Sequence, residues 1–152
     1  MLDRITAFLE ARMESGAINP DPFERAHVAI AALLVEASRM DGHYDAFEQG
    51  TVVRIIRETL NLQPAKAREL LALAEIRQAE TWHDWIFCLA IRRTHNLEER
   101  TAIMERLWEI ALSDGQLHRM EAMMLERIAQ ELDIPPDRVE RIRLAHQAPG
   151  ET

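Results

Sequence analysis

Cysteine and aromatic residues are scarce in this sequence, and each shortage narrows the fold and the chemistry. The one cysteine, Cys88, can form neither an intrachain disulfide nor a zinc cluster, and its apolar neighbours favour a packed core thiol. Aromatic residues make up 5% of the chain, and β-branched residues are sparse beside Ala, Leu, Glu and Arg. This composition favours helices over sheets.

Long apolar runs and an excess of positive charge are also missing. The longest apolar run covers 28–35 and is far shorter than the ~20 residues that a helix needs to span a bilayer. The net charge of −8 repels the phosphates of nucleic acids, so we expect no nucleic-acid partner. The N-terminal stretch lacks the apolar core of a signal peptide, so we expect a cytoplasmic protein.

Apolar residues recur at three- and four-residue steps along almost the whole chain, which predicts an all-α fold, a single bundle of about eight helices. The helix over about 23–40 is apolar all round at 28–35 and is expected to be the buried centre. Thr81 is expected to cap the helix that follows it, with Asp84 three residues on. The other predicted helices cover about 5–13, 47–60, 64–79, 82–93, 98–112, 117–132 and 134–146.

Glycine, at 5 of 152 residues, marks a pattern that occurs twice. Asp-Gly-x5-Glu runs from Asp41 to Glu48 and again from Asp114 to Glu121, 73 residues later. The apolar frame around the motif repeats as well, so we predict two pseudo-symmetric helix-turn-helix repeats, each built as helix, acidic glycine turn, helix, proline and helix. The aligned residues are Leu34 and Leu107, Glu36 and Glu109, Phe47 and Met120, and, after a slip of one residue, Val53 and Leu125, and Ile56 and Ile128.

Two copies of this motif between helices of an acidic chain resemble the tellurite-resistance TerB-like family, whose relatives include domains fused to J-domain co-chaperones. The resemblance covers about 23–146. We expect an N-terminal helical extension at 1–22, the TerB-like domain at 23–147 and a frayed tail at 148–152. The resemblance implies an all-α pseudo-symmetric bundle with no established catalytic activity. It also implies a link to the stress response at the membrane or to toxic oxyanions, and divalent-cation binding at the acidic turns.

The physical chemistry of the two turns supports two interpretations. In the first, each glycine closes a helix and each glutamate satisfies free amides at the start of the next helix. Asp45 and Glu48 then fit a capping box, whereas His118 is a poor cap for Glu121. In the second, the turns lie side by side, and their converging carboxylates need a cation to offset their repulsion. Oxygen ligands favour Ca²⁺ or Mg²⁺, and histidine ligands would favour Zn²⁺ or Mn²⁺. The candidate metal ligands are Asp41, His43, Glu48, Asp114, His118 and Glu121.

Three functions remain open from these features. The first is a non-catalytic, stress-associated binding module with an acidic, divalent-cation-binding cleft and a protein partner. The second is a metal-independent protein-interaction adaptor that docks its partner through helices bearing Met and Arg, and any contact with a membrane would be peripheral and made through partners. The third is a di-metal oxidoreductase, because Glu24 with His27 and Glu80 with His83 have the Glu-x-x-His spacing of di-iron carboxylate bundles.

Overall fold

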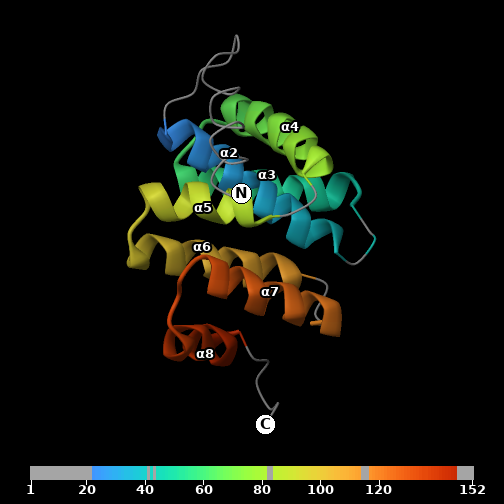
Figure 1. Ribbon diagram of the computed structural model, residues 1–152. Coiled ribbons are helices and arrows are strands. Elements are labelled where there is room, and N and C mark those ends of the chain that lie inside the picture. The colour runs from blue at the N-terminus through green and yellow to red at the C-terminus, as the bar shows by residue number, and fades with distance from the viewer. Residues whose placement is uncertain (1–21, 41, 43, 82–83, 114–116, 147–152) are drawn as a thin grey trace.

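The computed structural model describes residues 22–40, 42, 44–81, 84–113 and 117–146 (Figure 1). No strand occurs among these residues, so the predicted all-α fold is confirmed, while the predicted helix at 5–13 lies outside them. None of the described helices is long and apolar enough to cross a membrane. The helices are α2 (Pro22–Arg39), α3 (Ala46–Leu60), α4 (Pro64–Glu80), α5 (Trp85–Thr94), α6 (Leu97–Ala111), α7 (Arg119–Glu131) and α8 (Pro136–Ala145).

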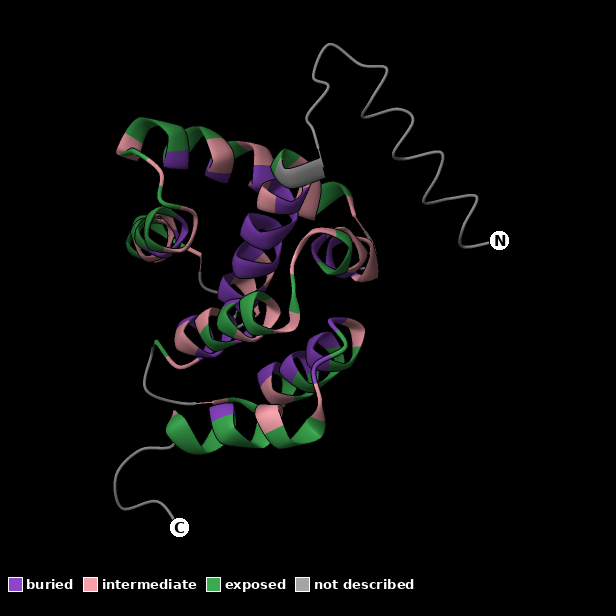
Figure 2. Ribbon diagram, turned by 90° about the vertical axis from the view of Figure 1, so that its left-hand side faces the viewer, coloured by how far each residue is buried: buried purple, intermediate pink, exposed green. Residues whose placement is uncertain are grey.

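Helix α2 is the centre of the bundle, as its all-round apolar pattern predicts. Every residue from 28 to 35 is buried, and Figure 2 shows that burial extends along most of the helix. Four helices pack against α2, namely α3, α4, α5 and α6. Because they cover its apolar stretch, that stretch has no polar side facing solvent. Helix α8, by contrast, buries Ile142 and presents most of its surface to solvent.

The two acidic turns follow helices that run in the same direction. Helix α6 packs against α2, and both helices end on the right-hand side of Figure 1, where α3 and α7 begin. Helix α3 packs against α4 and α2, while α7 packs against α5 and α6. This arrangement brings the described helix ends that flank both turns to one end of the molecule.

Burial in α3 and α7 follows the 73-residue step more closely than the sequence alignment predicts. Val52 and Leu125 are both buried, and so are Ile55 and Ile128, without the predicted slip of one residue. The spacing changes to 72 residues only where the helices end, because Asn61 and Asp133 have left-handed φ values of 55° and 56°. A left-handed residue closes a helix at its C-terminus. The change in spacing by one residue therefore occurs at the C-terminal ends of α3 and α7 and not within these helices.

The predicted cap at Thr81 is wrong. Thr81 follows the last residue of α4, and its hydroxyl donates a hydrogen bond to the backbone oxygen of Arg77 at 2.6 Å. A helix leaves its last carbonyl groups without internal partners, and this hydroxyl satisfies one of them. Helix α5 begins later, at Trp85, directly after Asp84.

Candidate functional site

The first acidic turn is closed by a glycine with a positive φ, as its sequence predicts. Gly42 has a φ of 82°, a conformation that residues with a Cβ atom rarely adopt, and its N–H donates to the backbone oxygen of Arg39 at 3.0 Å. At the other side of the turn, Oδ1 of Asp45 accepts a hydrogen bond from the backbone N–H of Glu48 at 3.1 Å. Asp45 is therefore the N-cap of α3, which confirms that half of the predicted capping box.

Glu121, at the start of α7, is a carboxylate with almost no exposure to solvent. The residue is 3% exposed, and its Oε1 accepts a hydrogen bond from the backbone N–H of His118 at 3.3 Å. The ring nitrogen Nε2 of His118 lies 3.9 Å from the same oxygen. The prediction that Glu121 has no capping partner is thus wrong, because the backbone of His118 supplies the donor.

The predicted metal ligands are divided between described and undescribed residues. Glu48, His118 and Glu121 are described, whereas Asp41, His43 and Asp114 lie outside the described residues. Within the described part of the chain, no three His, Cys, Asp or Glu side chains are arranged to hold a metal ion. A cation at the turns would therefore need ligands from Asp41, His43 or Asp114.

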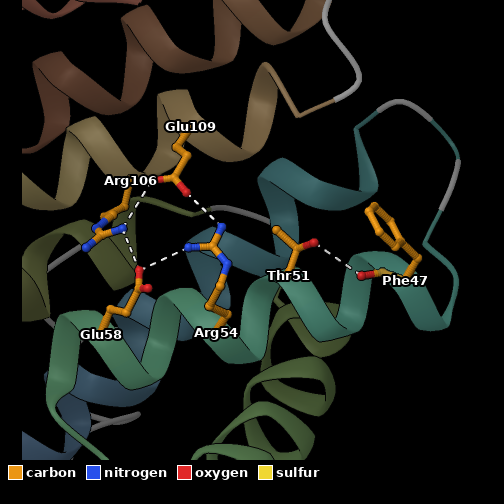
Figure 3. A network of polar contacts seen from close by, with 6 residues as sticks. All are labelled: Phe47, Thr51, Arg54, Glu58, Arg106 and Glu109. Atoms are coloured by element: carbon orange, nitrogen blue, oxygen red, sulfur yellow. Dashed lines mark hydrogen bonds and ion pairs between the residues drawn. The ribbon is translucent and has the colours of Figure 1, made fainter.

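A polar network links α3 to α6 at the surface, and we call it the surface network: Arg54, Glu58, Arg106 and Glu109 (Figure 3). Arg54 on α3 lies 3.0 Å from Glu58 and 2.9 Å from Glu109. Arg106 on α6 lies 3.0 Å from Glu58 and 3.1 Å from Glu109. Burial opposes the ionisation of Glu109, but the hydrogen bond from Arg54 and the charge of Arg106 outweigh it and lower the pKa of Glu109. Two guanidinium groups here balance two carboxylates.

A second network, the buried acid cluster, consists of Glu36, Asp84, Arg127 and Glu131 and joins α2, the start of α5, and α7. The Asp84 side chain is 3% exposed, and its Oδ1 accepts a hydrogen bond from Nη1 of Arg127. The same nitrogen lies 3.7 Å from Oε2 of Glu131. Burial, and then the charge of Asp84, raise the pKa of Glu36 to about 8. Glu36 is therefore mostly protonated at neutral pH.

The thiol of Cys88 adjoins this cluster. Burial, and then the charge of Glu131, raise the pKa of Cys88 well above its ordinary value. A thiol that resists ionisation is a poor nucleophile and a poor metal ligand. The sequence-based prediction of a packed core cysteine is confirmed, since Cys88 is buried within the hydrophobic core.

The buried acid cluster was not predicted from the sequence, although the chain carries a signal for it. In the surface network, a glutamate of α6, before the second turn, pairs with an Arg-x-x-x-Glu pair of α3, after the first turn. In the buried acid cluster, a glutamate of α2, before the first turn, meets the corresponding pair of α7, after the second turn. Asp84, which crowds the buried acid cluster with a third carboxylate, has no such signal. The residues that recur at the 73-residue step are Glu36 and Glu109, Arg54 and Arg127, and Glu58 and Glu131.

The two Glu-x-x-His motifs occupy different positions relative to the helices. Glu24 and His27 lie in the first turns of α2. Glu80 is the last residue of α4, and α5 begins at Trp85, so the second motif does not lie within one helix. His83 itself lies outside the described residues. Di-metal bundles present Glu and His from one helical face, and the second motif lacks that support.

Two exposed apolar side chains stand just after the acidic turns. Phe47 on α3 is 77% exposed and Met120 on α7 is 65% exposed. Phe47 belongs to the apolar frame that repeats in the sequence, whereas the buried residues of α3 begin at Val52. Single exposed apolar residues are ordinary, but these two occupy the same position in the two copies of the motif.

Comparison with known proteins identifies one family. The sequence model of the family described as Tellurite resistance protein TerB matches residues 27–144, which include both acidic turns and both networks. Neither the curated proteins nor the solved structures that were compared with the chain give a match.

Proposed function

The chain belongs to the family of tellurite resistance protein TerB, and from this premise we propose that it is a non-catalytic, stress-associated binding module with a divalent-cation-binding cleft at its two acidic turns. The observation that carries the proposal is the position of the helix ends. The ends of α2 and α6 and the starts of α3 and α7 lie at one end of the molecule (Figure 1). The described residues that flank the two turns therefore lie at the same end of the molecule.

The residues at that end suit a hard cation. Asp41, Glu48, Asp114 and Glu121 would supply oxygen ligands, which Ca²⁺ and Mg²⁺ prefer. His43 and His118 would shift the preference towards Zn²⁺ or Mn²⁺ if they contributed nitrogen ligands. A bound cation would offset the repulsion between the carboxylates and tie the first repeat to the second.

Calorimetric titration of chelator-treated protein with Ca²⁺, Mg²⁺, Mn²⁺ and Zn²⁺ tests the proposal. We expect binding of at least one of these ions, together with a rise in Tm, because a ligand that binds only the folded state stabilises it. The double substitution Asp41→Asn with Asp114→Asn should abolish both the heat of binding and the rise in Tm.

A matched control separates a specific site from general charge attraction. Glu69→Gln with Asp137→Asn removes the same amount of negative charge from exposed positions on α4 and α8. This control should bind the cation as the unmodified protein does. Equal metal-induced shifts in Tm for the two double variants, or no binding by the unmodified protein, would contradict the proposal.

A protein-interaction adaptor is the second candidate function, and the exposure of Phe47 and Met120 favours it. Exposed apolar residues beside acidic turns suit a partner that is both apolar and basic. A photo-reactive amino acid in place of Phe47 or Met120 should cross-link the same partner in cells, whereas one in place of the exposed Leu144 on α8 should not. Cross-links of equal yield at all three positions would show that this end of the molecule has no preference for a partner.

A further inference from the structure

The buried acid cluster contains carboxylate oxygens that lack a hydrogen-bond donor. Oε2 of Glu36, Oδ2 of Asp84 and Oε2 of Glu131 are all buried atoms without a hydrogen-bond partner in the described part of the chain. A buried acceptor without a donor is unfavourable, and most folded proteins avoid it. A proton held on one carboxyl group would turn that group into the missing donor.

The charges of the cluster lead to the same requirement. Glu36 faces Asp84, from the turn before α5, and both Arg127 and Glu131, from α7. The thiol of Cys88 on α5 feels the same carboxylates. Among the described residues of the cluster, one guanidinium group therefore stands against three carboxylates, and full ionisation would leave an excess of negative charge beside carboxylate oxygens that are buried.

We propose that Glu36 and Asp84 share one proton in the folded protein, so that the junction of α2, α5 and α7 is a proton-sensitive lock that weakens as the medium becomes alkaline. The shared proton lets the two carboxyl groups attract one another through a hydrogen bond, and Arg127 then neutralises the one negative charge left on this pair, while the charge of Glu131 stays uncompensated. When the proton leaves, Glu36 and Asp84 repel each other across the junction. This lock is independent of any cation at the acidic turns.

The direction of the pH dependence follows from proton linkage. The pKa of Glu36 is about 8 in the folded protein and 4.5 in its ordinary state. Between these values the folded protein holds a proton that the unfolded chain has released, so stability falls as the pH rises through this window and levels off above it. The contribution is greatest at acidic pH, which is the reverse of the behaviour of an ion-paired carboxylate.

Carboxyl carbon NMR of the full chain measures this proton directly. We expect one glutamate carboxyl resonance, assigned to Glu36 by through-bond correlation with its backbone amide in the unmodified protein, to titrate near pH 8 rather than near 4.5. Titration of Glu36 near pH 4.5 would overturn the proposal whether or not any variant folds.

Thermal unfolding of matched variants provides the second test. Glu36→Gln resembles the protonated carboxyl group, so the difference between its Tm and that of the unmodified protein should grow in its favour by about 4 °C per pH unit between pH 5 and pH 8. Glu109→Gln alters the glutamate at the same repeat position in the surface network, and its Tm should show no such gain. Parallel pH profiles for Glu36→Gln and the unmodified protein would contradict the lock.

A histidine control excludes the most obvious alternative source of pH dependence. His83 directly precedes Asp84 in the sequence and titrates near neutrality when unperturbed. His83→Gln should keep the fall in stability between pH 5 and pH 8 and the Glu36 titration near pH 8. Loss of both in His83→Gln would assign the proton to the histidine and overturn the proposal.

Discussion

The surface network and the buried acid cluster each contain a glutamate and an Arg-x-x-x-Glu pair that recur at the 73-residue step, yet their electrostatics are opposite. In the surface network, Arg54 and Arg106 neutralise their glutamates, and the pKa of Glu109 is lowered. In the buried acid cluster, burial and the added carboxylate of Asp84 raise the pKa of Glu36 to about 8. The comparison shows that the environment of an Arg–Glu pair, and not the pair itself, decides whether it favours ionisation.

The cluster also differs from the surface network in what the loss of an arginine leaves behind. Arg127→Ala removes the hydrogen-bond donor to Asp84, whose side chain is almost fully buried. We expect the free energy of unfolding to fall by about 2 kcal/mol, because a buried carboxylate is left unpaired, while the half-exposed position of Arg127 reduces the effect. Urea unfolding at pH 7 measures this change.

Arg54→Ala provides the matched control for Arg127→Ala. Arg54 pairs with Glu58 and Glu109, which are both substantially exposed, so we expect a loss of less than about 1 kcal/mol. If the two alanine variants lost equal stability, burial would not distinguish the two networks.

Substitution of the glutamate that recurs on α3 and α7 should have smaller effects, and the two substitutions should change the free energy of unfolding in opposite directions. Glu131→Gln removes one carboxylate from an overcrowded cluster, and we expect no loss of stability or a gain of about 0.5 kcal/mol at pH 7. Glu58→Gln breaks ion pairs with Arg54 and Arg106 and should cost about 0.5 kcal/mol. Urea unfolding of both variants at 50 mM salt measures the two changes in the free energy of unfolding. Changes of the same sign would contradict the contrast between the two networks.

Helix positions could be predicted from the sequence because local pattern decides them. The apolar run at 28–35 has no polar face, and only a central position buries all of it. Pro64 and Pro136 stand at the first helical positions of α4 and α8, where the fixed φ of proline suits the start of a helix. Thr81 was misplaced because a hydroxyl can satisfy a carbonyl at the end of one helix as well as an amide at the start of the next.

The contacts between distant helices could not be predicted in the same way. Glu36 and Asp84 are 48 residues apart, and no periodicity in either segment indicates that they meet. Phe47 belongs to the repeated apolar frame of the sequence, but at the first turn of α3 it lies away from the core. For the acidic turns, the sequence predicts the ligands and their number, and the fold adds that the flanking helix ends share one end of the molecule.

The central claim is that both acidic turns contribute to a single cation site, and Mn²⁺ titration followed by amide NMR tests it most directly. Paramagnetic Mn²⁺ broadens the signals of nearby nuclei, so substoichiometric Mn²⁺ should broaden the amide signals of Gly42 and Tyr44, at the first turn, together with those of Leu117 and His118, at the second. Ca²⁺ or Mg²⁺ in excess should restore them. Broadening at one turn only, or equal weak broadening over the whole acidic surface, would contradict a shared site.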